Sequence, residues 1–190
     1  MSDFSLELNA EERQYLRDLV LWSLDYYFEN GANPPAREVP LPPPASCLNK
    51  ELGAFVTFKL NGQLRGCIGQ IIGHGPLYQA VAQMAQAAAF ADPRFSPLQK
   101  DEMERLEFEI SIMGPIEPCP DTTRIEIGKH GLVIQEGRQR GLLLPQVAQE
   151  YNWDVPEFLE SVCRKAGLTP GAWKNPDAKL FWFECVVVQP

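Results

Sequence analysis

The chain has 190 residues, 45% of them hydrophobic, which is enough to fill the core of one sizeable domain or two small lobes. Its formal net charge of -8 argues against sequence-independent nucleic-acid binding, which depends on clustered Lys and Arg, and against docking on an anionic membrane. We therefore expect neither nucleic acid nor a membrane as a partner. A local basic patch could still exist, although a solvated hairpin edge explains its members more simply: Arg124, Lys129, Arg138 and Arg140.

Several sequence features predict a cytoplasmic protein without a metal or cofactor. No apolar run approaches the ~18 residues that a membrane span needs, and Met1-Ser2-Asp3-Phe4 lacks the basic region of a signal peptide. The five cysteines show no CxxC spacing, and the chain has only two histidines. A disulfide framework and a His/Cys zinc site are therefore both unexpected.

The first expected element is a helix that opens at a capping box formed by Asn9 and Glu12 and stops at Asn30-Gly31. The residues of one helix face recur at helical spacing and make that face largely apolar and aromatic: Tyr15, Leu16, Leu19, Trp22, Ser23, Tyr26 and Tyr27. Residues 34–45 then form a proline-rich connector, predicted to run extended over the surface. Its alternative role is a proline-motif ligand for a partner domain.

Residues 54–69 are predicted to form a β-hairpin. Asn61-Gly62 is the strongest short-range signal for a two-residue turn, because both positions tolerate φ > 0. Such a turn fixes the register of the two strands. The expected cross-strand pairs are Leu60 with Gln63, Phe58 with Arg65, and Val56 with Cys67.

After the hairpin, Pro76 opens a second, alanine-rich helix that should end before Pro93. A strand is expected at 107–113, because its residues alternate. Phe108, Ile110 and Ile112 point inward in this pattern. The outward-facing residues are Glu107, Glu109 and Ser111, and exposure to water explains them more simply than an acid/base pair.

The C-terminal part begins with a loop at 115–120. Three short strands are predicted at 125–127, 132–134 and 141–144, followed by a short helix at 145–151. Asp154 and Glu157 open one more helix, with Cys163 on its apolar face and Gly167 as its C-terminal cap. The last strand, 179–188, is apolar on both faces and should be central.

This order of elements predicts an α+β protein with a mostly antiparallel sheet and packed helices. We expect the hairpin and the last strand in the main sheet, with the first helix against one face. No linker or internal repeat is evident, so residues 1–190 are interpreted as a single domain, with room for a smaller second lobe.

Cys67 is the candidate catalytic residue. On a regular strand it would share a face with Arg65 at ~7 Å, and a cation beside an accessible thiol lowers the thiol pKa. Gly66 and Gly69 flank the thiol and permit a close approach by another group, so Arg65, Gly66 and Gly69 are the expected ligand-binding residues.

The alternative is that Cys67 is buried and structural, since free cysteine is among the most buried residue types. The opposite strand face is equally apolar, so the pattern leaves this open. Arg65 favours the functional interpretation, because a guanidinium on the thiol's face needs an acidic partner, water or an anionic ligand.

A nucleophilic cysteine needs a base or an orienting group. His130 is the first candidate and His74 the second, although both lie among glycines in turns, where surface histidines are common. Arg94 would reach the same site if the second helix packs back on the hairpin. Its alternative role is an ion pair with Asp92.

The stretch Leu64-Arg65-Gly66-Cys67-Ile68-Gly69 resembles the signature of the AMMECR-one family. Three further pieces are similar to the family, and the resemblance covers roughly Gly53 to the C-terminus. The three pieces are Asp92-Pro93-Arg94-Phe95, Gly141-Leu142-Leu143-Leu144-Pro145-Gln146-Val147-Ala148, and Cys163-Arg164-Lys165-Ala166-Gly167. The resemblance implies the α+β class. Relatives look like members of a gene system with a Memo-type protein and a radical SAM enzyme, which implies a role in a modification pathway.

The leading hypothesis is a cytoplasmic enzyme, or enzyme component, that binds a small polar or anionic ligand in a cleft containing Arg65 and Cys67. The second hypothesis is a non-catalytic protein-interaction module that presents the hairpin and the proline-rich segment to a partner. Nucleic-acid binding is disfavoured by the acidic charge balance.

Overall fold

A computed structural model describes Phe4 and residues 6–190; the rest of the N-terminal stretch Met1-Ser2-Asp3-Phe4 lies outside the described residues. Backbone contacts group the chain into two compact units, which are described separately. The N-terminal unit comprises residues 6–113 and Val186–Pro190, and the C-terminal unit comprises Phe4 and Gly114–Cys185. The last strand contributes to both.

The two α-helices of the N-terminal unit begin within one residue of their predicted starts, and Pro76 is the N-cap of the second rather than its first residue. The capping box of Asn9 and Glu12 is present, and Gly31 ends the first helix in the left-handed conformation at φ 65°. The 34–45 connector contains one short 3₁₀ helix and is otherwise irregular. The elements are α1 (Ala10–Asn30), 3₁₀ helices Ala36–Glu38 and Cys47–Asn49, β1 (Ala54–Leu60), β2 (Gln63–Gln70), α2 (Leu77–Phe90), 3₁₀ helix Lys100–Arg105, and β3 (Leu106–Met113).

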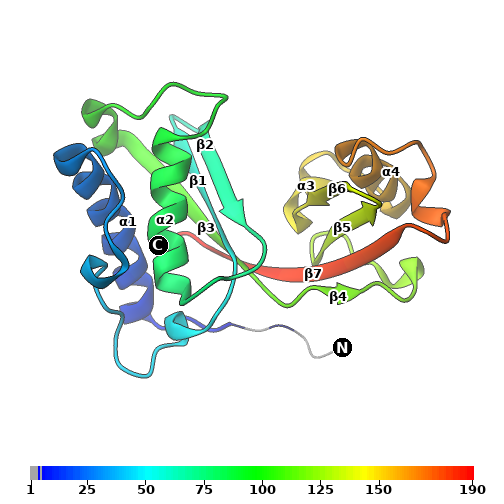
Figure 1. Cartoon of the computed structure of the whole chain (residues 1–190), viewed down its shortest axis with the longest axis horizontal. Helices are drawn as coiled ribbons and strands as arrows, with labels where there is room; N and C mark the ends of the chain where they lie inside the picture. The colour runs from blue at the N-terminus through cyan, green and yellow to red at the C-terminus, as the bar shows by residue number, and fades with distance from the viewer. Residues whose placement is uncertain (1–3, 5) are drawn as a thin grey trace. The chain divides into compact units, whose positions relative to one another are not determined.

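The sheet of this unit runs in the order β2-β1-β3, with both pairs antiparallel, and β2 is its edge strand. Helix α2 packs on β1 and β2, and α1 lies beside α2 and packs against it (Figure 1). Long apolar residues fill the space between sheet and helices, and fully buried examples are Leu16, Leu24, Val56, Phe58, Val81, Ile110 and Ile112.

The C-terminal unit is built on an antiparallel sheet in which β7 lies between β5 and the short strand β4. Its elements are β4 (Glu117–Pro118), 3₁₀ helix Thr122–Arg124, β5 (His130–Glu136), β6 (Gln139–Leu143), α3 (Pro145–Glu150), α4 (Val155–Lys165), 3₁₀ helix Ala172–Lys174, and β7 (Lys179–Val188). The Asp154–Glu157 capping box of α4 is confirmed.

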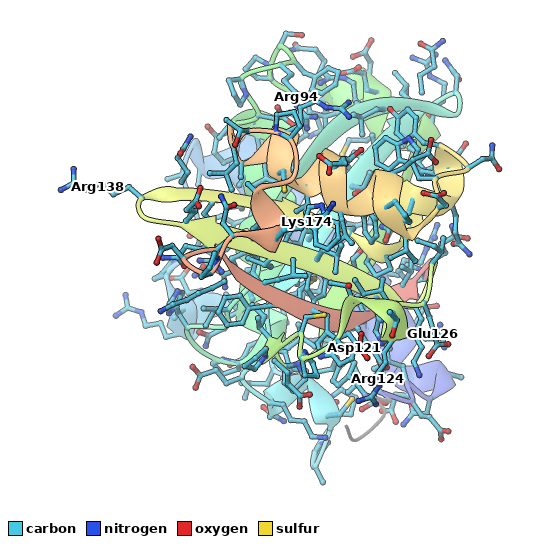
Figure 2. The ribbon with its side chains drawn as sticks, turned by 90° about the vertical axis from the view of Figure 1, so that its right-hand side faces the viewer. Arg94, Asp121, Arg124, Glu126, Arg138 and Lys174 are labelled. Atoms are coloured by element: carbon cyan, nitrogen blue, oxygen red, sulfur yellow. The ribbon has the colours of Figure 1, made fainter. Side chains whose placement is uncertain are left out.

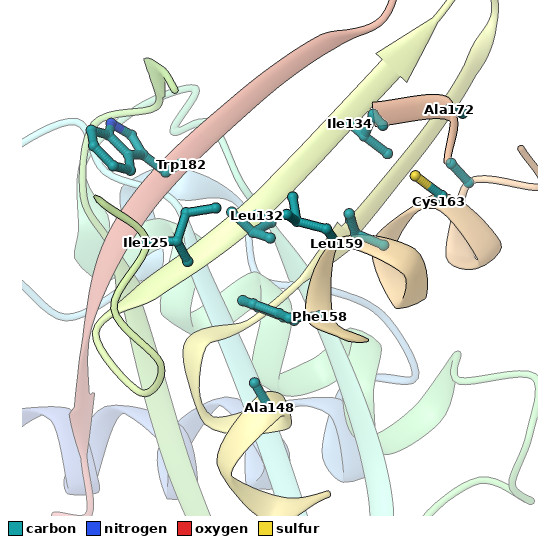
Figure 3. Close-up of a cluster of buried hydrophobic side chains, with 11 residues drawn as sticks. Ile125, Leu132, Ile134, Ala148, Phe158, Leu159, Cys163, Ala172 and Trp182 are labelled. Atoms are coloured by element: carbon teal, nitrogen blue, oxygen red, sulfur yellow. The ribbon is translucent and has the colours of Figure 1, made fainter. Parts of the chain in front are cut away.

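The core of this unit lies between its sheet and α4. Phe158, Leu159 and Cys163 of α4 point at Leu132 and Ile134 of β5 (Figure 3). The predicted core position of Cys163 is confirmed, since its side chain is fully buried. Burial also raises the pKa of this thiol, which keeps it neutral.

The α+β class is confirmed, and three local predictions are wrong. Residues 125–127 form no strand, because Glu126 instead accepts backbone hydrogen bonds in the turn before β5. The expected loop at 115–120 contains strand β4, which pairs with β7. Ser111 is 1% exposed rather than facing water, although it alternates with the buried Ile110 and Ile112.

Candidate functional site

The turn of the β1–β2 hairpin is as predicted. Asn61 and Gly62 both have positive φ, 51° and 75°, which matches the right-handed twist of the flanking strands. Leu60 pairs with Gln63, in the predicted register. The predicted hairpin and its first cross-strand pair are therefore confirmed.

Beyond the first pairs, the predicted register is wrong by one residue. Lys59 pairs with Leu64, and Phe58 then pairs with Gly66, so a β-bulge leaves Arg65 without a partner in β1. The remaining predicted pair is shifted in the same way: Cys67 faces Thr57, and Val56 faces Ile68.

The bulge has a steric cause. Phe58 is buried beneath the helices, so the residue opposite it also faces α2. A Cβ built on Gly66 would overlap the carbonyl oxygen of Ala88 in α2, so only glycine fits there. The unbulged register would place the Arg65 side chain at this point. Gly69 is constrained too, since a Cβ there would overlap the ring of Phe55. The two glycines thus serve packing between elements.

Arg65 has the acidic partner that its position requires. Its Nε and Nη2 donate to the two carboxylate oxygens of Glu102, both at 2.8 Å, and its Nη1 donates to the carbonyl of Ser96 at 2.9 Å. Only 12% of the Arg65 side chain and 16% of the Glu102 side chain are exposed. Arg65 chiefly lowers the pKa of Glu102, so the pair stays charged. This bidentate pair ties β2 to the segment before β3.

The Asp92 carboxylate and the Arg94 guanidinium hold the main chain of Cys67. Asp92 Oδ2 accepts the Cys67 N–H at 2.9 Å, and Arg94 Nη2 donates to the Cys67 carbonyl at 3.1 Å. The two side chains also pair with each other, Nη2 to Oδ2 at 2.6 Å. Because β2 is an edge strand, this clamp satisfies backbone groups that would otherwise be unpaired.

The ion pair expected between Arg94 and Asp92 is therefore present, and it lies at Cys67. Asp92 is 4% exposed, and its hydrogen bonds from Arg94 hold the pKa of its carboxyl well below the usual range. The Arg94 side chain (labelled in Figure 2) is 53% exposed. Hydrogen bonding to Asp92 chiefly raises the pKa of Arg94, so its guanidinium stays charged beside the main chain of Cys67.

The Cys67 side chain belongs to the sheet face opposite the helices. Thr57 Oγ1 donates a hydrogen bond to the Cys67 sulfur at 3.2 Å. Across β1, Thr57 also pairs with Glu109 of β3, so the three residues form a row over three strands. Lys59 Nζ contacts Glu109 Oε2 at 3.2 Å. Cys67 itself is half-buried. The row combines a thiol, a hydroxyl donor and a carboxylate.

Lys59 and Glu109 also border a cavity of about 330 Å³. Its lining is rich in charge, with Arg17 from α1 and Glu107 from β3 among its members. In the register, Glu109 lies two strands away from Cys67, or roughly 10 Å at ~4.8 Å per strand. The cavity therefore borders the row only at its Glu109 end, and a small ligand in the cavity would reach only that end of the row.

Among the described residues, neither histidine considered as a base makes a hydrogen bond to Cys67. His130 belongs to the C-terminal unit, where its imidazole is buried and stacks on Trp182 at 4.7 Å between ring centroids. Its Nδ1 accepts the N–H of Glu126 at 3.0 Å, and burial lowers the pKa of the ring. His74 is exposed in the turn before α2. Of the predicted site residues, the structure brings together Arg65, Gly66, Cys67, Gly69 and Arg94 within one unit.

The basic residues at the C-terminal hairpin are dispersed. Arg124 lies over the ring of Trp182 at 5.7 Å, and Lys129 lies 3.7 Å from Glu184. Arg138 extends away from the β5–β6 turn, whereas Asp121, Arg124 and Glu126 lie together near the turn before β5 (Figure 2).

The roles of Thr57, Glu102 and Glu109 were not predicted from the sequence. A hydrophilic residue in the otherwise apolar run 54–58 was the available signal for Thr57. Glu102 lies 37 positions from Arg65, so no local pattern could pair them. Within the described chain, no group of three or more His, Cys, Asp and Glu side chains is placed to hold a metal ion.

Fold and site together define an α+β protein whose antiparallel edge strand presents a cysteine held by a remote Asp–Arg pair. The model of the AMMECR1 family matches residues 18–188, and the chain belongs to this family. The resemblance seen in the sequence is therefore confirmed.

Relatives and a solved structure agree with this assignment. Protein MK0488 of Methanopyrus kandleri is 38% identical over 192 residues, covering 96% of this chain and 90% of the relative. Protein NEQ441 of Nanoarchaeum equitans is 44% identical over 144 residues, covering 72% and 80%. The crystal structure of PH0010 from Pyrococcus horikoshii superposes with a TM-score of 0.84 at 33% identity, covering 96% of this chain and 93% of that one. Across the described residues, no helix combines the length and apolar character that crossing a bilayer requires.

Proposed function

We propose that this AMMECR1-family protein is a cytoplasmic enzyme, or the substrate-binding component of one. It binds a small polar or anionic ligand over the sheet face that carries Cys67, with the sulfur as nucleophile or contact. The observation that carries the proposal is the hydrogen bond from Thr57 Oγ1 to the Cys67 sulfur. The main chain of Cys67 is held at its N–H by Asp92 and at its carbonyl by Arg94. The Thr57 contact, together with the fixed main chain, holds the sulfur in one orientation, as a nucleophile or a ligand contact requires.

In this proposal Arg94 contacts the ligand, in place of Arg65. Most donors of Arg65 are used by Glu102, Ser96 and Pro97, whereas Arg94 is half exposed. The Nη1 group of Arg94 makes no hydrogen bond to any described residue, so its two N–H groups point to an anion as the natural acceptor. Glu109, on the same row as Cys67, is a carboxylate suited to accept a proton.

The family membership supports a place in a modification pathway alongside a Memo-type protein and a radical SAM enzyme. This part of the proposal follows the resemblance and not the geometry.

The proposal is tested by a thermal-shift screen of small carboxylates, phosphates and amides on the wild type and on Cys67→Ser, Arg94→Gln and Cys119→Ser. Cys119 is a half-buried cysteine in the C-terminal unit and serves as the matched control. We expect a compound that stabilises the wild type and Cys119→Ser, and that loses its effect with Cys67→Ser and Arg94→Gln.

Brief treatment with iodoacetamide, followed by mass mapping, tests the thiol separately. Cys67 should be alkylated well before the buried Cys163. Protection of Cys67 equal to that of Cys163, together with no stabilising compound, would refute the thiol site.

A further inference from the structure

A groove runs between α1 and the proline-rich segment Pro40–Pro44, far from Cys67 in the sequence and lined only by residues of the N-terminal unit. Its volume is about 730 Å³. Tyr15 Oη donates to the carbonyl of Pro40 at 2.6 Å, which fixes the proline wall to the helix. Leu41, on that wall, is 78% exposed. The segment thus encloses the groove and does not fill it.

The helical wall of the groove alternates carboxylates with aromatic rings. Glu11, Tyr15, Asp18 and Trp22 are spaced by four, three and four residues, so they lie on one face of α1. Glu11 and Asp18 are seven residues apart, which is roughly 10 Å along the helix at 1.5 Å per residue. Among the residues that line the groove in the described chain, none is cationic.

The helix's own cations do not neutralise these carboxylates. Arg13 Nε donates to the carbonyl of Leu8, and Arg17 Nη1 donates to the carbonyl of Pro190. Asp18 accepts only from the neutral amide of Gln14, at 2.9 Å, among the described residues. The groove therefore has an uncompensated negative charge beside two aromatic side chains, and an ordinary solvated helix face would not place both against a fixed apolar wall.

We propose that this groove binds a segment of a partner protein that carries two cationic side chains about 10 Å apart, with an apolar side chain between them. Arg or Lys at each end pairs with Glu11 or Asp18, and the same cation lies over Tyr15 or Trp22. The apolar residue packs on Leu41 and the prolines. In a polyproline II peptide at ~3.1 Å per residue and three residues per turn, side chains i and i+3 lie on the same side and roughly 9 Å apart, so the two cations occupy positions i and i+3. This surface is independent of the function proposed for Cys67.

The test uses the acetylated and amidated peptide Arg-Leu-Ala-Arg, titrated into the full chain at low ionic strength while amide shifts are followed by NMR. Saturable shifts are expected in the first half of α1 and at Leu41. A peptide with Gln in place of both Arg residues should bind much more weakly, because it lacks the charges. Binding should also weaken as salt is added.

Variants locate the site. Asp18→Asn and Glu11→Gln should each weaken binding of the Arg peptide about two- to fivefold, the range of an exposed ion pair, and the double variant more. Asp25→Asn removes the same charge from an exposed position of α1 outside the groove and should leave binding unchanged. Equal weakening by Asp25→Asn would show unspecific attraction to an acidic protein and overturn the proposal. So would the absence of saturable shifts with the wild type, or equal binding of the Gln peptide.

Discussion

Replacing Asp92 by Asn tests the clamp on Cys67 with the smallest possible change. The Asp92 carboxylate accepts four hydrogen bonds, from the Arg94 N–H, Arg94 Nε, Arg94 Nη2 and the Cys67 N–H. An asparagine amide keeps one oxygen and presents two N–H donors instead. Whichever way the amide is turned, its oxygen keeps two of the four hydrogen bonds. Its NH₂ group then faces the other two donors, which lose their acceptor.

The magnitude follows from the groups that are lost. With the oxygen on the side of the Arg94 N–H and Nε, the Cys67 N–H and Arg94 Nη2 lose their acceptor. Each lost hydrogen bond costs about 1–3 kcal/mol. The half-exposed Arg94 side chain can hydrogen-bond to water instead, so the total cost lies in the lower part of the range for two lost bonds. We expect Asp92→Asn to lower the free energy of unfolding by about 2–4 kcal/mol, and the melting temperature by roughly 5–15 °C for a chain of this size.

The pH dependence gives an independent check. Since the folded-state pKa of Asp92 lies below its unfolded value of about 3.9, its contribution to stability is fully present above that pH and is lost as the pH falls toward the folded pKa. The stability difference between the wild type and Asp92→Asn should therefore be constant from neutral pH to about pH 5 and shrink below about pH 4.

Urea unfolding followed by circular dichroism, at several pH values, measures both effects. Asp101→Asn makes the same chemical change at an exposed position and should stay within ~0.5 kcal/mol of the wild type. If Asp92→Asn is as stable as this control, or if its deficit is the same at pH 3 and pH 7, the clamp does not stabilise the edge strand.

Three further predictions concern two residues of the hairpin and Cys185 of β7. Arg65→Lys keeps the charge but loses the bidentate geometry, so thermal denaturation should show a loss of about 1.5–3 kcal/mol; an unchanged melting point would contradict a structural ion pair. Gly66→Ala forces α2 away from β2 and should lower the denaturation midpoint clearly, whereas Gly137→Ala, in open space, should cost only its backbone strain. Burial raises the pKa of Cys185 to about 11, so its alkylation rate should keep rising above pH 9; a plateau below pH 9 would contradict that environment.

Local signals in the sequence were sufficient for the ends of elements. The capping boxes at Asn9 and Asp154 and the turn at Asn61-Gly62 each combine residue types that satisfy the backbone within a few positions, and all three are present. Their reliability has a physical basis, because the interacting groups are close along the chain and little else competes for them.

The register of β2 and the partner of Arg65 depend on residues remote in sequence. The bulge arises because α2 approaches the sheet so closely at Ala88 that the residue opposite Phe58 must be glycine. Glu102 reaches Arg65 across 37 positions. A regular alternation of strand faces could foresee neither contact, since both depend on how a helix and a loop pack on the hairpin.

The contacts of Asp92 and Arg94 allow the role of the Cys67 sulfur to be tested by substitution. Asp92 and Arg94 hold the N–H and the carbonyl of residue 67, and neither contact depends on its side chain. Cys67→Ser should therefore keep the edge strand in place while it replaces the thiol. A stable Cys67→Ser protein without ligand response would assign the response to the sulfur. A destabilised one would mean that the Thr57–Cys67 contact contributes to packing of the sheet face.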